Sequence, residues 1–372
     1  MIKVGITGQQ GFIGQHLYNT LGIFPKEFER VNFHRDFFKD INKLTDFVAQ
    51  CDVVIHLAAV NRHHDPEIIY NINIELVKKL IDALEASAKK PHVLFSSSSQ
   101  EERDNSYGKS KKEGRGMLKN WSEKVGATFT GIVIPNVFGP FGHPYYNSFI
   151  ATFCHQLTHR EQPKIDIDGQ VKLIYIDELV DFFLREIRSA FSNDCLIIPH
   201  TAEFKVSEIL GKLELYKTEY FDKGVIPELS NYFEINLFNT FRSYIDIASH
   251  YPVKYIKNID SRGTFVEIIR LNAGGQISFS TTVPGITRGN HYHTRKIERF
   301  SVIKGKALIQ LRKIGTKEIF EFYLDGENPS YVDMPVWYTH NIKNIGEEEL
   351  YTNFWINEFY DPKDPDTYLE IV

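Results

Sequence analysis

Cysteine is scarce in this 372-residue sequence, which contains only Cys51, Cys154 and Cys195. Three cysteines so far apart exclude a disulfide framework, and none has a partner at metal-ligand spacing. No window of 18 apolar residues occurs, and no basic segment followed by an apolar one opens the chain, so we expect neither secretion nor membrane insertion. The net charge of −5 excludes a general basic field for nucleic acid. We therefore expect a cytoplasmic protein that binds no nucleic acid.

What is present is an ordinary globular composition, with 42 % hydrophobic and 24 % charged residues. The length predicts two or three domains at roughly 150 residues each. Histidine is distributed unevenly: of 14 histidines, only His291, His293 and His340 fall after residue 252. Those three positions therefore call for an explanation.

Short apolar runs alternate with longer amphipathic stretches from residue 1 to about 190. This alternation predicts right-handed crossovers and a doubly wound parallel α/β sheet. We expect strands at 3–7, 30–33, 53–57, 93–95 and 129–134, and helices at 14–21, 72–85 and 109–121. Helical patterns continue at 206–213 and 232–247.

The pattern changes after Pro252, where short β-type runs are separated by Gly, Pro, Asn and Asp turns. These runs lie at 265–271, 276–282, 299–303, 307–313, 317–323 and 350–356. They predict an all-β sandwich or barrel of the jelly-roll kind. We therefore expect a first domain at 1–243, a linker at 244–252 and a second domain at 253–372.

A glycine-rich turn, Gly8-x-x-Gly11-x-x-Gly14, follows the first expected strand and opens a helix. Glycines there allow a pyrophosphate to approach the backbone at the helix N-terminus, which is typical of a dinucleotide-binding Rossmann fold. At the end of the second strand, His34 and Arg35 offer positive charge to a 2′-phosphate. This favours NADPH over NADH.

A serine run, 96–99, ends the fourth expected strand, and Tyr107 and Lys111 follow at helical spacing. Residues four apart on a helix share a face, so the ammonium can lower the phenol's pKa and orient the cofactor ribose. In that arrangement Tyr107 exchanges a proton during hydride transfer while a serine polarises the carbonyl. The run alone leaves open which serine takes this role; by resemblance to reductases with this arrangement, counted from Phe95, it is Ser98, with Ser97 as the alternative.

Residues 1 to about 243 resemble an extended short-chain dehydrogenase/reductase acting on nucleotide sugars, with supporting segments at 53–59 and 134–140. The resemblance implies that Asp40 contacts adenine and that Asn136 lies on the substrate side. Where the family usually has an arginine that contacts the diphosphate, this chain has Lys172. Related 4,6-dehydratases carry an Asp-Glu pair directly after the strand-end hydroxyl residue, whereas Ser98 is followed by Ser99 and Gln100. Keto reduction is therefore favoured over elimination of water.

The second domain carries a spaced set of ligand-type residues, His291-x-His293-x4-Glu298 and, far downstream, His340. Three imidazoles and a carboxylate can bind a divalent transition metal. The spacing resembles the cupin signature, with Trp337 at a position where that family usually has glycine. Zinc is our first expectation, although iron, manganese or nickel also suit these ligands, and a metal-free histidine cluster is the alternative. Tyr292, Lys296 and Tyr338 lie near enough in sequence to be considered as an acid or base.

Together the two domains resemble bifunctional enzymes of bacterial capsular-polysaccharide synthesis that make the UDP-N-acetyl-L-fucosamine precursor. The resemblance implies C3 epimerisation of a UDP-4-keto-6-deoxy-2-acetamido-hexose in the cupin domain, NADPH-dependent reduction of the C4 ketone in the first domain, and a zinc-containing homodimer. Two alternatives stay open: a single-activity reductase with a structural, dimerising cupin, and a ligand-sensing scaffold without turnover. An Fe(II) oxygenase fits the ligands alone, but nothing supplies a 2-oxoacid site.

Overall fold

The computed structural model describes residues 1–87 and 89–372. The chain divides into two compact units, one formed by 1–152 with 167–206 and the other by 153–166 with 207–372. The domain boundary predicted at 244–252 stays a prediction, because a compact unit of the chain need not coincide with a domain defined by its fold. No helix among the described residues is both long enough and apolar enough to cross a membrane.

The first unit is built on a six-stranded sheet, and the predicted parallel α/β architecture is confirmed. Every strand pair in it is parallel. The sheet order is β2 (Phe28–Val31), β1 (Ile2–Thr7), β3 (Val53–His56), β4 (His92–Ser98), β5 (Phe129–Ile134) and β8 (Asn193–Ile197). Because helices cover both faces of such a sheet, its central strands are buried, and all four residues of β3 are buried, whereas the edge strand β8 is mostly exposed.

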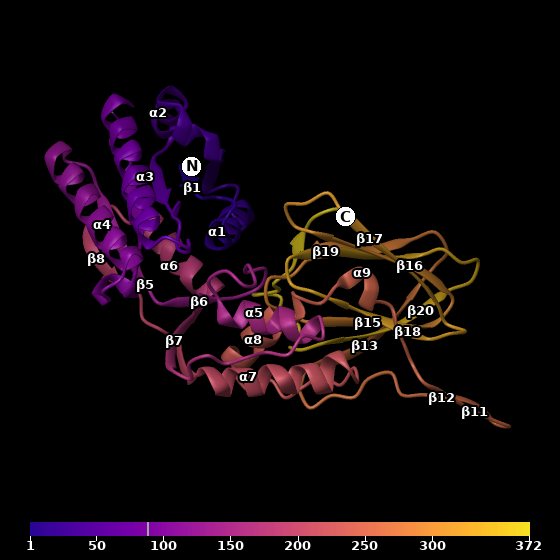
Figure 1. The fold of residues 1–372 in the computed structure, drawn as a ribbon. Coiled ribbons are helices and arrows are strands. Elements are labelled where there is room, and N and C mark those ends of the chain that lie inside the picture. Colours follow the sequence, from indigo (N-terminus) through magenta and orange to yellow (C-terminus); the bar gives the residue numbers. More distant parts are fainter. Residues whose placement is uncertain (88) are drawn as a thin grey trace. The chain divides into compact units, whose positions relative to one another are not determined.

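Helices cover this sheet on both sides (Figure 1). Phe47, Leu80 and Leu118, from three different helices, pack in one buried cluster against Val54 and Phe95 of the strands. The helices of this unit are α1 (Phe12–Ile23), α2 (Ile41–Gln50), α3 (Pro66–Ser87), α4 (Ser106–Val125) and α6 (Ile176–Arg188), with short turns at Arg35–Lys39 and Ser99–Glu102. Helix α5 (Phe149–Thr158) runs from the first unit into the second. A small second sheet has the order β6 (Asn136–Phe138), β7 (Gln170–Tyr175) and β9 (Ala202–Lys205).

The second unit contains two five-stranded antiparallel sheets, whose strands, from β10 to β21, all lie after residue 252, and this confirms the all-β prediction for residues 253–372. Along one strand, Ala307, Ile309 and Leu311 alternate with more exposed residues, as expected where one face meets the core. One sheet has the order β10 (Val253–Lys254), β18 (Ser330–Met334), β15 (Glu298–Lys304), β20 (Leu350–Ile356) and β13 (Gln276–Thr282). The other has the order β17 (Ile319–Asp325), β16 (Lys306–Lys313), β19 (Tyr338–Asn344), β14 (Thr287–Tyr292) and β21 (Tyr368–Leu369).

Smaller elements complete the second unit. The hairpin of β11 (Lys257–Asp260) and β12 (Gly263–Val266) extends away from the two sheets (Figure 1). The helices are α7 (Val206–Leu215), which continues through the helical turns of Tyr216–Phe221, α8 (Tyr232–Arg242) and α9 (Ile247–His250).

A buried charge network joins these helical segments to the strands. Arg299 on β15 and Asp333 on β18 form a two-bond ion pair, with N···O distances of 2.7 and 2.9 Å. The Tyr220 hydroxyl donates to the same carboxylate at 2.7 Å, and Arg242 donates to the Tyr220 oxygen at 3.1 Å. Since an unpaired buried charge is costly, each member depends on the others.

We predict that Asp333→Ala lowers the free energy of unfolding by about 3–5 kcal/mol, because Arg299 is left buried without its counter-charge. Asp166→Ala is the matched control, since its partner Lys164 is 84 % exposed, and surface pairs are worth only about 0–1 kcal/mol. Urea unfolding of the two variants measures the difference. Equal losses in both would contradict the structural role of the network.

Candidate functional sites

The glycine turn lies where the strand order of the parallel sheet reverses, with β2 on one side of β1 and β3 on the other. Gly8 has φ +77°, and a Cβ there would lie 2.8 Å from the Ala58 backbone nitrogen. A Cβ on Gly14 would lie 2.3 Å from the Gly8 carbonyl oxygen. Gly11 directly precedes α1 and donates its N–H to that same oxygen at 2.9 Å. Ligands of open α/β sheets bind at this reversal, where the backbone and the helix N-terminus can receive a pyrophosphate.

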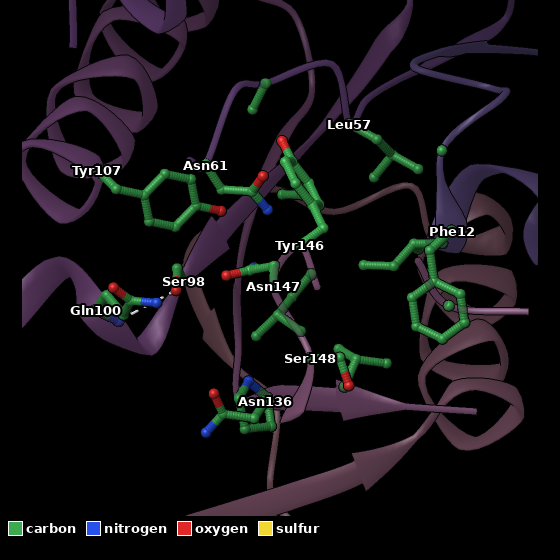
Figure 2. Close-up of a pocket in the computed structure, with 18 of the residues that line it drawn as sticks. Phe12, Leu57, Asn61, Ser98, Gln100, Tyr107, Asn136, Tyr146, Asn147 and Ser148 are labelled. Atoms are coloured by element: carbon green, nitrogen blue, oxygen red, sulfur yellow. Dashed lines mark hydrogen bonds between the residues drawn. The ribbon is translucent and has the colours of Figure 1, made fainter. Parts of the chain in front are cut away.

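A cavity of about 680 Å³ opens at this turn and continues along the carboxyl ends of the strands. Figure 2 shows the Tyr107 ring directed into it, with Asn61, Ser98 and Tyr146 around the same space. Lys111 and Asn136 also line it. The size suits a small organic ligand with a few polar contacts.

The four serines of the run differ in their hydrogen bonds. The Ser96 hydroxyl donates to the His56 carbonyl oxygen at 3.1 Å, and the Ser97 hydroxyl donates to the Glu101 carboxylate. The Ser98 oxygen instead accepts from the Gln100 N–H at 3.2 Å. Ser98 thus keeps its own proton for a donor bond into the cavity that it lines.

Glu101 is the carboxylate nearest in sequence to this run, and it is buried in an ion pair. Arg115 donates to its two oxygens at 2.9 and 2.6 Å. Burial by itself opposes the charged form, but the bonds from Arg115 and Ser97 outweigh it and hold the Glu101 pKa below its ordinary value. Gln100, which has no acidic proton, lines the cavity instead. An acid suited to eliminating water is therefore not supplied by this segment.

Tyr107 and Lys111 lie one turn apart at the start of α4, where Asn105 caps the helix by accepting the Gly108 N–H at 2.7 Å. The Lys111 ammonium donates to the Ser96 carbonyl oxygen at 2.8 Å and lies 5.8 Å from the centre of the Tyr107 ring. Burial lowers the pKa of Lys111 to about 7. Burial, with Tyr146 nearby, raises the pKa of Tyr107 to about 12. The phenol's pKa is thus raised rather than lowered, contrary to the expectation from the sequence, because desolvation raises it and the ammonium is directed at Ser96.

The residues expected at the adenosine end lie just beyond β2. His34 and Arg35 are exposed there, and the neighbouring Asp36 pairs with Lys39 at 2.6 Å. The Asp40 carboxylate accepts the N–H groups of residues 42 and 43 and so begins α2. Asp40 therefore has a helix-capping role whatever else it contacts.

The two residues expected on the substrate side, Asn136 and Lys172, are neighbours across β6 and β7. The Asn136 amide donates to the Lys172 carbonyl oxygen at 3.1 Å. Leu173 lines the cavity, and successive side chains of a strand point to opposite faces. The Lys172 side chain therefore lies on the face of β7 away from the cavity.

Sequence reasoning missed Asn73, which is buried in α3. Its side chain binds both backbone groups of Val60, at 2.7 and 2.9 Å, and donates to the Ser110 hydroxyl at 3.0 Å. It thereby fixes the loop after β3 that carries Asn61 to the cavity. The available signal was one asparagine between two isoleucines in an apolar helical face. The cavity-lining segment 142–150, which includes Tyr146, had no comparable signal.

In the second unit the structure brings all four expected metal ligands together. Their ligand atoms lie within 4.8 Å of one another. His291 and His340 are cross-strand partners on β14 and β19, next to a bulge at Asn290, whose φ is +59°. His293 directly follows β14, and Glu298 begins β15.

The orientation of these side chains suits a metal ion. The Nε2 atoms of His293 and His340 lie 3.1 and 3.2 Å from the same Glu298 oxygen, and these three atoms are buried with no hydrogen-bond partner. The Nδ1 atoms of the two rings face the carbonyl oxygens of Asp366 and Tyr338. Burial lowers the pKa of His291 to about 4, which keeps its ring neutral. Burial by itself opposes a charge on His293, but the Glu298 carboxylate outweighs burial and raises the pKa of that ring above its ordinary value. A ring whose Nδ1 is held by a carbonyl presents its Nε2, and such rings are typical metal ligands.

The three residues considered as an acid or base are all buried. Tyr292 stacks on Trp337, with ring centres 5.7 Å apart, and Lys296 donates to the Pro365 carbonyl oxygen at 2.7 Å. Burial raises the pKa of Tyr338 to about 12. Trp337 has φ +63°, so the turn does adopt the left-handed backbone that favours glycine.

A comparison with known families gives the class of this protein. Residues 4–195 match the NAD dependent epimerase/dehydratase family, to which the chain belongs. Residues 258–368 match the polysaccharide biosynthesis C-terminal domain.

Two of the relatives that this chain resembles cover almost all of it. A protein of Pseudomonas aeruginosa named UDP-2-acetamido-2,6-beta-L-arabino-hexul-4-ose reductase is 33 % identical over 99 % of this chain and 98 % of its own. The crystal structure of the capsular polysaccharide assembling protein CapF from Staphylococcus aureus is 33 % identical, covers both chains completely and has a TM-score of 0.62. The structure of RMD from P. aeruginosa with NADPH is 21 % identical over 59 % of this chain and 83 % of its own, with a TM-score of 0.53, and supports the fold alone. The resemblance to capsular-polysaccharide enzymes inferred from the sequence is thereby confirmed.

We predict that binding of a nicotinamide dinucleotide in the first cavity takes up a proton above pH 7. In the empty pocket Lys111 loses its charge above its pKa of about 7, and an anionic ligand beside it raises that pKa. Affinity should therefore fall up to about tenfold per pH unit above 7. Calorimetry at pH 8 in two buffers of different ionisation enthalpy measures the uptake, which Lys111→Met should abolish. A binding enthalpy independent of buffer in the wild type contradicts this prediction.

Proposed function

We propose that this protein is a bifunctional nucleotide-sugar enzyme. It epimerises C3 of a UDP-4-keto-6-deoxy-2-acetamido-hexose in its β domain, predicted at 253–372, and then reduces the C4 ketone in its Rossmann domain, predicted at 1–243. The product serves synthesis of UDP-N-acetyl-L-fucosamine for capsular polysaccharide, in the cytoplasm where NADPH and nucleotide sugars are made. The observation that carries the proposal is the presence of two built sites on a chain similar over its full length to a hexul-4-ose reductase.

In the reductase site, Ser98, Tyr107 and Lys111 act on the ketone. NADPH supplies the hydride that C4 accepts. Tyr107 gives the proton to the carbonyl oxygen, and Ser98 donates a hydrogen bond to that oxygen through the proton it retains. Lys111 orients the ribose and, once charged beside the anionic cofactor, lowers the phenol's pKa from its value in the empty pocket.

The cofactor and substrate are held mainly by neutral groups. The turn of Gly8, Gly11 and Gly14 receives the pyrophosphate, and His34 with Arg35 selects NADPH by its 2′-phosphate, helped by the Lys39 pairing of Asp36. Asp40 lies near the adenine. Asn136 lines the substrate side of the cavity, and Lys172 contributes through its carbonyl, which fixes Asn136.

In the β domain, which we interpret as a jelly-roll cupin, His291, His293, Glu298 and His340 hold a divalent metal ion, with zinc as the first choice. The three buried atoms without hydrogen-bond partners support this, since they otherwise stay unsatisfied. The C3 proton is α to the C4 ketone and is acidic for that reason, and a bound metal supplies a Lewis acid for the charge that its removal creates. Reduction at C4 then removes the ketone and makes the new C3 configuration permanent.

A second candidate is a single-activity reductase whose β domain is structural. The P. aeruginosa relative favours it, because that protein is named only as a reductase. The buried, converging ligand atoms favour the bifunctional proposal, since a purely structural barrel has no need of them.

Incubation of the 4-keto UDP-sugar in D₂O distinguishes the two candidates. We predict deuterium at C3 without NADPH, seen by NMR, and its loss in His340→Ala. Tyr107→Phe should keep this exchange while lowering NADPH oxidation by about 10²–10⁴-fold. Each variant controls for the integrity of the other site, and Tyr232→Phe, at a tyrosine 80 % exposed, is the matched control. Exchange no faster than in buffer refutes the epimerase, and absence of NADPH oxidation refutes the reductase.

We also propose that the protein is a homodimer formed through its second unit. Strand β13 ends the order of its sheet and exposes Ile277 and Phe279, while the β11–β12 hairpin exposes Ile259 and Phe265. Apolar side chains on an edge strand and on an extended hairpin are typical of a surface that a second chain covers.

We predict that Phe279→Lys raises the dimer dissociation constant at least about tenfold, because a charge replaces an apolar side chain within the interface. Sedimentation over a dilution series measures it, with Tyr323→Lys, on another exposed strand position, as control. A wild type that is monomeric at all concentrations overturns the dimer.

A further inference from the structure

The four residues 294–297 separate the expected ligands His293 and Glu298, and three of their backbone amides converge on one side chain. The Asp366 carboxylate accepts the N–H of Thr294 at 3.1 Å, of Arg295 at 3.0 Å and of Lys296 at 3.0 Å. It also accepts the Thr294 hydroxyl at 2.7 Å. Asp366 is only 2 % exposed, so these bonds are shielded from water.

Asp366 also contacts one of the expected metal-ligating residues directly, because its backbone carbonyl accepts a hydrogen bond from His293 Nδ1. A ring nitrogen that faces a carbonyl must carry the proton, which leaves the lone pair on Nε2 for the metal. The Asp366 backbone has φ +40°, an uncommon conformation for aspartate. It allows the carboxylate to bind the loop while the carbonyl binds the ring.

The two residues before Asp366 also bind the loop of 294–297. The Lys296 ammonium donates to the Pro365 carbonyl oxygen at 2.7 Å, and the Arg295 guanidinium donates to the Asp364 carboxylate at 3.1 Å. Immediately after this segment, β21 pairs with β14, and Tyr368 lies opposite Tyr292. The C-terminal segment is therefore fastened to the strand and to the loop that carry three of the four ligands.

We propose that Asp366 is the positioning residue of the metal site: its carboxylate sets the spacing of His293 and Glu298, and its carbonyl sets the tautomer and orientation of His293. This inference rests on the proposed metal binding. A carboxylate that merely ended a loop would stabilise the fold without affecting how the metal is held.

Asp366→Asn tests the side chain alone, since asparagine has the same size and tolerates a positive φ. One carboxylate oxygen accepts from Thr294 and the other from both Arg295 and Lys296. An amide NH₂ in either place opposes backbone donors. Asp361→Asn is the matched control, because Asp361 is exposed in the same C-terminal segment and accepts the N–H of Lys363, outside the loop of 294–297.

The readouts are the rate at which EDTA removes Zn²⁺ and the visible absorption of the Co²⁺-substituted protein. We expect Asp366→Asn to lose Zn²⁺ about 10–100-fold faster than the wild type and to show an altered Co²⁺ band, because second partners of metal ligands affect affinity by that factor. Asp361→Asn should match the wild type in both. Asp366→Asn within twofold of the wild type in extraction rate, with the same Co²⁺ band, overturns the inference.

Metal retention by the wild type and by His340→Ala distinguishes failure of this inference from failure of the proposed metal site. If the wild type retains no Zn²⁺ or Co²⁺, or if His340→Ala retains as much, the metal site itself is refuted. If Asp366→Asn fails to fold, hydrogen exchange in the wild type decides. Removal of Zn²⁺ should then accelerate exchange of the amides of 294–296 at least tenfold, with little change in β16, by reciprocity between metal and hydrogen-bond network. Unchanged exchange at 294–296 overturns the proposal.

Discussion

A carboxylate taken out of water must be given hydrogen-bond donors or cations, and this requirement organises both units of the protein. In the first unit Glu101 is paired with Arg115 beside the serine run. In the second, Asp333 binds Arg299, Glu298 lies between two histidines, and Asp366 accepts three backbone amides. Each of these acidic side chains fixes the positions of the groups that bind it. The arrangement of the residues around each acid therefore depends on how its charge is paired.

The consequences for chemistry differ between the two sites. The Glu101 pairing removes a potential acid from the cavity of the first unit, occupies the Ser97 hydroxyl and leaves Ser98 as a donor. Glu298 instead has an oxygen without a hydrogen-bond partner, facing the Nε2 atoms of His293 and His340. A carboxylate whose oxygens all have hydrogen-bond partners stabilises the fold. A carboxylate that faces nitrogens without hydrogen-bond partners is arranged to bind a further group, such as a metal ion.

Much of the fold could be predicted because its signals are local. The strand bounds expected at 276–282 and 350–356 are those of β13 and β20. Strands β18 and β19 were not expected, because they are buried on nearly every residue and show no alternation. The strand expected at 265–271 is instead the end of a hairpin, β12, that stops at Val266. Apolar content there predicted a strand, but its side chains are largely exposed.

By itself the sequence determined the two kinds of fold and the residue types of both sites, since glycine spacing, Tyr107 with Lys111 and the histidine pattern depend on local periodicity. Only the tertiary structure decided which serine keeps a free proton, that burial sets the pKa of Tyr107 and Lys111, and that Asn73 and Asp366 support the two sites. The physical reason is distance along the chain. Asp366 lies 73 residues from His293, and burial is a property of the packed chain, so neither can be read from neighbours in sequence.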